Sequence, residues 1–248
     1  RCKRNFGCQR KTGIGNNCEF VLNFFLPVNS KVCHCTNARY FIMDENSKPE
    51  FWEKNFIEKQ EMWGMEPAKS ALLTKDLFLE RSVKKVLIPG IGYGRNAQIF
   101  RENGMTVTGI EISETAIELL KKHLGSEMTV YHGSVTDMPF DQLQYDGIFC
   151  YALIHLLDED ERQKLIRTCY DQLSENGCMV FTVVSKEAPT YGTGKWIGKD
   201  RYEQFGGVNM FFYDEESIRA EFSGAGLVEI KKVQENFPFY FIICQKHN

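Results

Sequence analysis

Hydrophobic and polar positions change their spacing in a regular way along most of this chain. Short runs rich in Val, Ile, Leu and Phe are separated by longer segments in which apolar residues recur every three or four positions. The short runs predict β-strands, and the longer segments predict amphipathic helices that bury one face. Because the two kinds of segment alternate, we expect a parallel sheet covered by helices.

The predicted elements begin after residue 66 and continue to the end of the chain. Predicted strands occupy residues 83–89, 106–112, 128–132, 145–151, 178–184, 227–233 and 237–245. Predicted helices occupy residues 95–103, 113–123, 158–173 and 214–222, and Ser113 and Asp158 are suited to cap two of them. Only a short turn separates the last two strands, which predicts an antiparallel strand at the end of the sheet.

One segment, residues 185–212, is rich in Gly, Tyr and Lys and shows neither spacing. We therefore expect an irregular connection there, and connections of this length inside a domain are often lids or binding loops. Tyr191, Lys195, Trp196 and Tyr202 are candidates for a substrate lid, and they are equally compatible with simple decoration of a surface loop.

The composition is that of one folded domain. Hydrophobic residues make up 43% of the chain and charged residues 25%, both ordinary values. A length of 248 residues suits one α/β domain with at most an appendage. The formal net charge of -3, without a long cluster of Lys and Arg, gives no reason to expect a nucleic-acid partner.

The first 42 residues differ from the rest of the chain. They hold seven Lys and Arg, the single acid Glu19 and five of the nine cysteines, and Met43 is the first methionine. We expect residues 1–42 to be an N-terminal extension outside the core, and residues 43–248 to be the functional domain.

Two alternatives exist for the extension. Cys33, His34 and Cys35 could hold a metal, but zinc sites usually pair their ligands as C-x2-4-C, so we expect no metal. The apolar run at 20–26 could belong to a secretory signal, but Asn23 interrupts it and no clear cleavage site follows. The run is also too short to span a bilayer, and we expect no membrane partner.

The four later cysteines, Cys150, Cys169, Cys178 and Cys244, lie in apolar or helical contexts and lack the spacing of a disulfide framework. We expect them to be free thiols of the core. Free thiols are typical of reducing compartments, so a cytoplasmic location is expected.

A glycine turn joins the first predicted strand to the first predicted helix. Its sequence is Gly90-Ile91-Gly92-Tyr93-Gly94, and glycines allow backbone amides to approach a ligand closely. Glu111 lies 17 residues after Gly94, at the tip of the second strand, where an acid can accept hydrogen bonds from ribose hydroxyls. Together these features predict a nucleotide-like site.

The glycine spacing bears on which nucleotide is bound. Dinucleotide sites use G-x-G-x-x-G, whereas this chain has G-x-G-x-G and carries Arg95 where the third glycine of that fingerprint would stand. The chain also lacks a G-K-[ST] phosphate loop. A nicotinamide-dependent oxidoreductase is therefore the weaker hypothesis.

The segment 86–94 resembles the first motif of class I S-adenosylmethionine-dependent methyltransferases. Pro89 and the segment 109–113 are similar to the thiopurine methyltransferase-like branch of that class. Members of this branch often begin with a tryptophan-containing helix and loop, which residues 51–54 and 62–64 resemble.

The resemblance covers roughly residues 50–246. It implies a Rossmann-like, doubly wound α/β fold, with a mainly parallel seven-stranded sheet and an antiparallel C-terminal strand. It also implies S-adenosyl-L-methionine as the cofactor and a small molecule as the methyl acceptor.

The cofactor-binding residues that the resemblance implies lie between residues 52 and 150 of this segment. They are Trp52, Trp63, Pro89, Gly90, Ile91, Gly92, Glu111, Ile112, Ser134, Val135 and Cys150. Glu111 would bind the ribose and Ile112 would lie against the adenine. Two positions depart from the pattern, because Ser134 stands where an Asp commonly helps to bind adenine and Ile88 stands where many relatives have an acid.

Several of these side chains have two interpretations. Trp52 and Trp63 could attract the sulfonium charge by cation–π contact, or could simply fix the N-terminal helix to the sheet. Tyr151 is expected to face the methyl donor together with Cys150, and is a candidate catalytic residue with His155. A neutral His155 could accept a proton near pH 7, or could be a structural histidine under the loop.

The predicted activity is methyl transfer to a sulfur, nitrogen or oxygen nucleophile of a small molecule. Two other classes stay open, namely an NAD(P)-dependent oxidoreductase and a non-catalytic domain that binds the cofactor or a partner. A nucleic-acid methyltransferase is disfavoured because residues 150–153 read Cys-Tyr-Ala-Leu in place of an N/D-P-P-Y/F-type segment.

Overall fold

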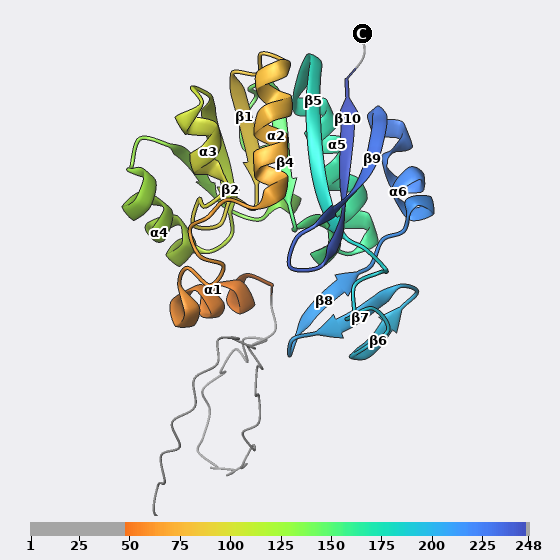
Figure 1. The fold of residues 1–248 in the computed structure, drawn as a ribbon. Helices are drawn as coiled ribbons and strands as arrows, with labels where there is room; N and C mark the ends of the chain where they lie inside the picture. Colours follow the sequence, from red (N-terminus) through yellow and green to blue (C-terminus); the bar gives the residue numbers. More distant parts are fainter. Residues whose placement is uncertain (1–47, 247–248) are drawn as a thin grey trace, which may run out of the picture. The chain divides into compact units, whose positions relative to one another are not determined.

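The computed structural model describes residues 48–246 (Figure 1). The chain divides into two units, Arg1–Ile42 and Met43–Asn248, and all described residues belong to the second. The predictions made for residues 1–42, including the alternatives at Cys33, His34 and Cys35, lie outside the described residues.

A seven-stranded sheet forms the centre of the described unit (Figure 1). Its strands, in spatial order, are β3 (Thr129–His132), β2 (Thr106–Glu111), β1 (Lys85–Pro89), β4 (Tyr145–Tyr151), β5 (Leu173–Val184), β10 (Pro238–Gln245) and β9 (Leu227–Gln234). The first five strands pair in parallel, whereas β10 pairs antiparallel with both β5 and β9. The predicted fold class, with its antiparallel C-terminal strand, is therefore confirmed.

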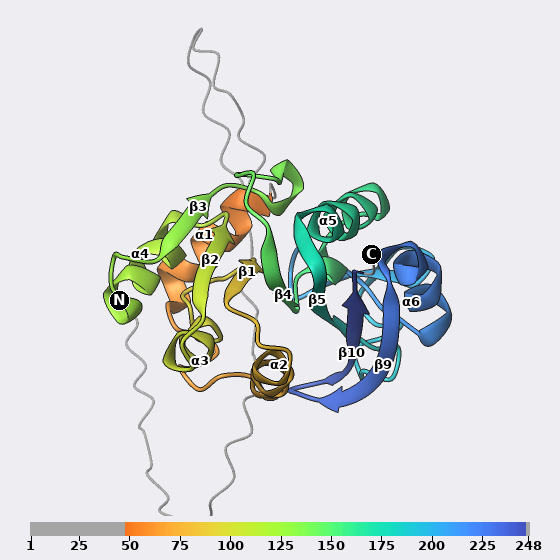
Figure 2. The ribbon, with the colours of Figure 1, turned by 90° about the horizontal axis from the view of Figure 1, so that it is seen from above.

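Helices cover both faces of the sheet, as Figure 2 shows from above. One face carries α2 (Lys69–Glu80), α3 (Ala97–Glu102) and α4 (Glu114–Leu124), and the other carries α5 (Glu159–Gln172) and α6 (Glu215–Phe222). A further helix, α1 (Lys48–Lys59), packs against α4. The two layers enclose separate hydrophobic clusters.

The helix starts follow the predicted capping residues. The Ser113 hydroxyl accepts a hydrogen bond from the Ala116 amide at 3.1 Å. Asp158 and Glu161 form a reciprocal capping box at the start of α5, with distances of 2.7 and 2.9 Å. These side chains satisfy amides that no helical carbonyl can reach, so each helix begins where the sequence indicated.

Helix α2 was absent from the sequence-based prediction, because its apolar residues do not gather on one face. Leu72, Leu73 and Leu79 are exposed, whereas Ser70 and Thr74 are buried. The usual apolar stripe of a surface helix is therefore missing. The polar residues are buried because their groups are satisfied: Thr74 Oγ1 donates to the Ser70 carbonyl at 2.7 Å.

The prediction of an irregular segment at 185–212 is wrong for residues 195–211, whereas residues 186–194 form turns. This segment contains a second, three-stranded antiparallel sheet of β6 (Lys195–Gly198), β7 (Arg201–Gln204) and β8 (Val208–Phe211). Its strands have only four residues each, too few to show a period, and the residues between them have positive φ angles, 57° at Asp200 and 75° at Gly206. Gly206 and Gly207 are the turn residues of the hairpin that joins β7 to β8.

The boundary between α5 and β5 also differs from the prediction. The helix ends at Gln172 and the strand begins at Leu173, five residues earlier than expected. Asn176 adopts a φ of 62°, and a Cβ at Gly177 would lie 2.8 Å from Leu173 Cγ. Asn-Gly therefore bends the early part of the strand, where the pairing with β4 is irregular, and does not end the helix.

The four later cysteines are free and buried, as predicted.

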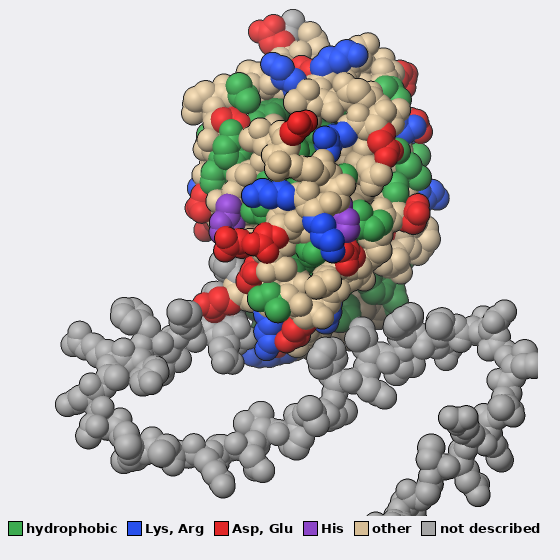
Figure 3. All heavy atoms as spheres, turned by 90° about the vertical axis from the view of Figure 1, so that its left-hand side faces the viewer, with side chains coloured by type: hydrophobic (Ala, Val, Ile, Leu, Met, Phe, Trp, Pro, Cys, Tyr) green, Lys and Arg blue, Asp and Glu red, His purple; other side chains and the backbone are tan. Residues whose placement is uncertain are grey.

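No helix among residues 48–246 is both long enough and apolar enough to cross a membrane. Acidic and basic side chains are intermixed on the side of the molecule where α4 lies (Figure 3).

Lys186 links the smaller sheet to the main one. Its ammonium group lies 2.8 Å from Asp200 in the β6–β7 turn and 2.6 Å from Asp214 at the start of α6. The Tyr191 hydroxyl donates to the other oxygen of Asp200 at 2.7 Å. Asp214 also caps α6 by accepting the Ser217 amide at 2.8 Å.

This arrangement predicts a pH-dependent contribution of Asp214 to stability. Its hydrogen bond with Lys186 lowers the pKa of the Asp214 carboxyl from 3.8 to about 2. A carboxyl whose pKa falls on folding stabilises the protein above its unfolded pKa, and the contribution is lost as pH falls through the folded value. We expect Asp214→Ala to lower the free energy of unfolding by about 1 kcal/mol at pH 7, mainly through the lost cap. The difference from wild type should shrink below pH 4 in urea titrations.

The matched control is Glu216→Ala, because Glu216 is exposed in the same turn of α6. It should change stability little at any pH. An Asp214→Ala deficit of constant size down to pH 3 would contradict the assigned ion pair.

Candidate functional site

The glycine turn follows β1 and is pinned to the end of β2. The amides of Gly90 and Ile91 both donate to the Ile110 carbonyl, at 2.9 and 3.0 Å. Gly90, Gly92 and Gly94 have φ angles of 69°, 58° and 87°, a region that disfavours residues with a Cβ. The sequence G-x-G-x-G is therefore a backbone requirement of this turn.

The three glycines face different surroundings. A Cβ at Gly94 would lie 2.8 Å from Leu124 Cδ1, and one at Gly90 would lie 3.0 Å from Leu153 Cδ2. At Gly92 the nearest heavy atom would be Phe56 Cζ, at 4.0 Å. The space beside Gly92 is therefore open, and a ligand can approach the backbone there.

Glu111 is the last residue of β2, and its side chain turns back toward the glycine turn. One carboxylate oxygen accepts the Gly92 amide at 2.8 Å, and the other accepts the amides of Ile112 and Ser113, both at 2.9 Å. The residue is only 5% exposed. Burial raises the pKa of Glu111, and the three amide hydrogen bonds oppose that shift because they favour the ionised form.

An aromatic cluster covers the turn on the side of α1. Trp63 stacks on Tyr93, the fourth residue of the turn, with ring centroids 6.2 Å apart and planes 10° apart. Trp52 and Phe56 from α1 lie 6.4 and 6.0 Å from Trp63. Trp63 still exposes 45% of its surface, so part of its ring is free to contact a ligand.

Tyr93 fixes the loop that carries Trp63. Its hydroxyl donates to the Gly64 carbonyl at 2.7 Å and accepts the Trp63 amide at 3.1 Å. Tyr93 was not predicted as a site residue because the glycine motif specifies no residue type at its position. The sequence features that could have indicated this contact are the aromatic residue at position 93 and the segment Met62-Trp63-Gly64.

Glu53 is a second residue that sequence reasoning missed. Its carboxylate accepts the hydroxyls of Ser113 and Thr115, at 2.6 and 2.5 Å. This carboxylate therefore joins α1 to the start of α4, directly beyond Glu111. An acid near the start of a helix is also favoured by the helix dipole.

The third motif lies next to the second strand. The Gly133 amide donates to the Glu111 carbonyl at 2.9 Å. Ser134 Oγ accepts the Thr136 amide at 3.2 Å and so caps the short 3-10 helix Val135–Asp137, in which Val135 is buried. Ile112 is partly buried, so its side chain remains accessible beside Glu111.

Cys150 and Tyr151, at the end of β4, point to opposite faces of the sheet. Cys150 is fully buried in the cluster between the sheet and α5, and burial raises the pKa of its thiol. The expectation that its side chain faces the methyl donor is therefore wrong, because successive side chains of a strand point to opposite faces. Only the backbone of Cys150 can line the site.

Tyr151 points to the other face and remains partly exposed. Its ring stacks on Phe239 with centroids 6.4 Å apart, and the Arg95 guanidinium lies 6.0 Å from its centroid. Burial raises the pKa of Tyr151 to about 12, so its phenol is neutral at physiological pH.

His155 lies deeper, in the short 3-10 helix Ile154–Leu156 after β4. It is 3% exposed, its ring packs edge-on against Phe239 at 5.8 Å, and its Nδ1 has no hydrogen-bond partner among the described residues. Burial lowers the pKa of His155 to about 3. The imidazole is therefore neutral at pH 7 and a weak base, and its catalytic role stays a prediction.

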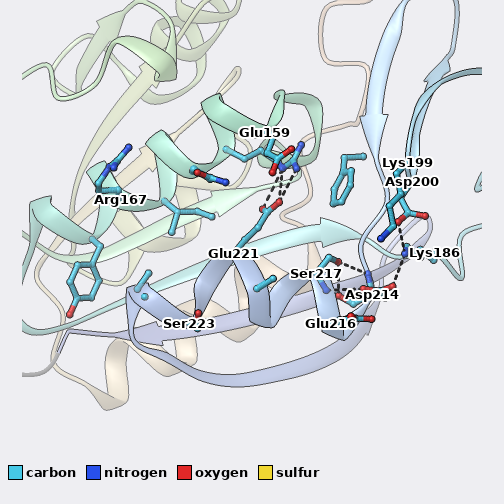
Figure 4. A pocket seen from close by; sticks show the side chains of 18 of the residues that line it. Glu159, Arg167, Lys186, Lys199, Asp200, Asp214, Glu216, Ser217, Glu221 and Ser223 are labelled. Carbon is cyan, nitrogen blue, oxygen red and sulfur yellow. Dashed lines mark hydrogen bonds and ion pairs between the residues drawn. The ribbon is translucent and has the colours of Figure 1, made fainter.

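A separate hollow of about 980 Å³ lies between α5 and α6, away from the glycine turn (Figure 4). None of the predicted site residues lines it. Its buried cation, Arg162, is paired with Glu221 at 2.8 Å, and Lys186 is paired with Asp200 and Asp214. Because these charges neutralise one another, the glycine turn is the stronger candidate site.

Comparison with known protein families finds a match in the region that contains the turn. Residues 86–177 match a methyltransferase domain family. This part of the chain is therefore similar to a methyltransferase domain. The match begins in β1 and includes the glycine turn, Glu111 and the end of β4, so it covers the elements that build the site.

Individual relatives match the chain over a similar length. An uncharacterized methyltransferase of Oceanobacillus iheyensis is 31% identical over 103 residues, which are 42% of this chain and 48% of that protein. A ubiquinone biosynthesis O-methyltransferase of Pseudomonas savastanoi is 30% identical over 113 residues, which are 44% of this chain and 47% of that protein. The chain thus matches less than half the length of these relatives.

A solved structure supports the fold over a longer range. The 1,6-didemethyltoxoflavin-N1-methyltransferase of Burkholderia thailandensis, with bound S-adenosylhomocysteine, superimposes with a TM-score of 0.65 at 15% identity. The superposition covers 81% of this chain and 87% of that one. The prediction of a class I methyltransferase fold is confirmed, and the family and fold support an enzyme with S-adenosylmethionine as its cofactor.

Substitution of Gly94 tests the backbone conformation of the glycine turn and its packing against Leu124. We expect Gly94→Ala to lower the free energy of unfolding by about 2–4 kcal/mol, because the left-handed φ is strained and the new Cβ meets Leu124. Gly104→Ala is the control, since Gly104 has a φ of 79° but nothing within 4 Å of a Cβ. It should cost only about 1 kcal/mol. Equal losses in chemical denaturation would contradict the packing of Leu124 on the turn.

The lowered pKa of the buried His155 leads us to expect that the stability of the protein depends on pH. A histidine whose pKa falls on folding binds its proton only in the unfolded state, so stability is lost as pH falls below the unfolded value of 6.5. Near pH 5 this term amounts to about 1.4 kcal/mol per pH unit. We expect His155→Gln to reduce the slope of unfolding free energy against pH between pH 7 and 5. An unchanged slope in His155→Gln would contradict the lowered pKa of His155.

Proposed function

We propose that this chain transfers a methyl group from S-adenosylmethionine to a nucleophilic atom of a small molecule. The observation that carries the proposal is the buried Glu111 carboxylate, held against the Gly92 amide beside open space. A fixed carboxylate at the end of the second strand is suited to accept hydrogen bonds from ribose hydroxyls.

The residues around the turn fit the rest of the cofactor. Gly90, Ile91 and Gly92 would pass beside its methionine part, and Ile112 and Val135 would lie beside its adenine. Trp63, with its partly exposed ring, would lie near the sulfonium, which an aromatic face attracts. When bound, the cofactor supplies the activated methyl group.

The chain's own part in the reaction is to align the acceptor and to exclude water. Tyr151, whose raised pKa keeps its hydroxyl neutral, would orient the acceptor. The smaller sheet exposes Trp196 and Phe205, which we propose as lid surfaces that cover the acceptor. His155 is a weak base in this environment, so an acceptor that is already ionised, such as a thiolate, fits the site best.

Such an acceptor agrees with the thiopurine methyltransferase-like branch, which we propose as the finer family. The support is Pro89 before the first glycine, the Gly109–Ser113 segment, and the tryptophan loop that Tyr93 holds over the turn. A Cβ at Gly109 would lie 2.6 Å from Ile91 Cδ1, so this glycine makes room for the turn. We also propose a cytoplasmic location, on the ground of the four free, buried cysteines.

Calorimetric titration with S-adenosylhomocysteine tests the proposal. We expect clear binding to the wild type, and a loss of about 1.5–3 kcal/mol in Glu111→Gln, because a charged hydrogen-bond acceptor is removed. Glu114→Gln is the control, since Glu114 is an exposed acid three residues further along. It should bind as the wild type does.

The same titration with NAD(P)H tests the alternative that the protein is an NAD(P)-dependent oxidoreductase. Wild-type protein that binds NAD(P)H in preference to S-adenosylhomocysteine would overturn the methyltransferase assignment. Binding of S-adenosylhomocysteine with unchanged affinity in Glu111→Gln would overturn the ribose assignment alone. Thermal unfolding of each variant checks that a lost affinity is not a lost fold.

A further inference from the structure

Arg95 is the residue directly after the glycine turn, and its side chain reaches back across the site. Nη1 donates to the Trp63 carbonyl at 2.9 Å, and the guanidinium carbon lies 6.0 Å from the centre of the Tyr151 ring. The head group thus lies between the tryptophan loop and the end of β4, and both of these belong to the proposed cofactor and acceptor site.

No carboxylate of residues 48–246 lies within ion-pair distance of this guanidinium. Its Nε is buried and has no hydrogen-bond partner among the same residues. Arg162 shows the usual arrangement, because its guanidinium binds Glu221 through two nitrogens, with distances from 2.8 to 3.3 Å. The neighbours of Arg95 are the Trp63 carbonyl, the Tyr151 ring and the Tyr93 hydroxyl, none of which carries a full negative charge, so the guanidinium has donors available for an anion.

We propose that Arg95 binds the α-carboxylate of the cofactor's methionine part. This inference rests on the proposed function, and it assigns to Arg95 a role that the glycine motif does not include. A guanidinium presents its donors as a planar fork that matches a carboxylate. The methionine part would pass over Gly90–Gly92, and Arg95 is the cation that follows this turn in the chain.

The surroundings of Arg95 favour a strong contact. Trp63 and Tyr151 flank the head group and shelter it partly from water, and this strengthens an ion pair. The bond to the Trp63 carbonyl also orients the guanidinium before a ligand arrives, so less side-chain freedom is lost on binding. Arg95 would therefore couple carboxylate binding to the position of the tryptophan loop.

Two ligands that differ only in the amino-acid part provide the test. S-Adenosylhomocysteine carries the carboxylate, whereas 5′-methylthioadenosine keeps the adenosine and the sulfur but lacks the amino acid. We expect Arg95→Met to weaken binding of S-adenosylhomocysteine about 10- to 100-fold, as for a charged hydrogen bond removed. Its affinity for 5′-methylthioadenosine should stay within about twofold of wild type, because that ligand makes no such bond. Arg95→Lys should recover part of the loss, since the charge remains but the fork does not.

Arg101→Met is the matched control. Arg101 is also an arginine that donates to a backbone carbonyl, that of Leu124, but it lies in α3 and is not one of the proposed cofactor-binding residues. This variant should bind both ligands as the wild type does.

Three outcomes distinguish the possibilities. Equal weakening of both ligands in Arg95→Met would overturn the inference, because it would show that Arg95 only supports the tryptophan loop. Unchanged affinity for S-adenosylhomocysteine would overturn it as well, and would leave the proposed function intact. Absence of binding of either ligand to the wild type would overturn the proposed function itself.

Discussion

The hydrogen bonds between the Glu111 carboxylate and three backbone amides are the constraint on which the site depends. One oxygen fixes Gly92 in the turn after β1, and the other fixes Ile112 and Ser113 at the start of α4. The same side chain therefore sets the position of two loops that arise from neighbouring strands. Because Ser113 in turn binds Glu53, helix α1 is placed by the same chain of contacts. These hydrogen bonds favour the ionised form of Glu111 and offset part of the effect of burial, which raises the pKa of this carboxyl.

Much of this arrangement was predictable from the sequence, because it depends on local chemistry. The parallel strands carry continuous apolar runs, the helices begin at side chains that cap them, and the turn needs glycines for its φ angles. Gly94 and Glu111 could be assigned to one site because parallel strands bring their carboxyl ends to the same edge. Ser113 and Asp158 were recognisable as caps for the same reason: each acts within four residues.

What could not be predicted depends on contacts between distant residues. The buried Ser70 and Thr74 hide the period of α2, since their polar groups are satisfied by hydrogen bonds that the sequence does not display, including one to Glu235. The strands of the smaller sheet are too short to show a period. Tyr93 gains its importance from Trp63 and Gly64, some thirty positions earlier in the chain. The orientation of Cys150 depended on the phase of β4, which a fully buried strand conceals.

The two ends of the segment that contains the smaller sheet lie next to each other on the main fold. Ser185, just after β5, forms a bridge with Tyr213, just before α6, so both ends of the insertion are held side by side. A segment with such closely spaced ends can change in length or sequence with little effect on the strands that carry Glu111 and the glycine turn. In protein engineering, the segment between Ser185 and Tyr213 could therefore be replaced as a unit.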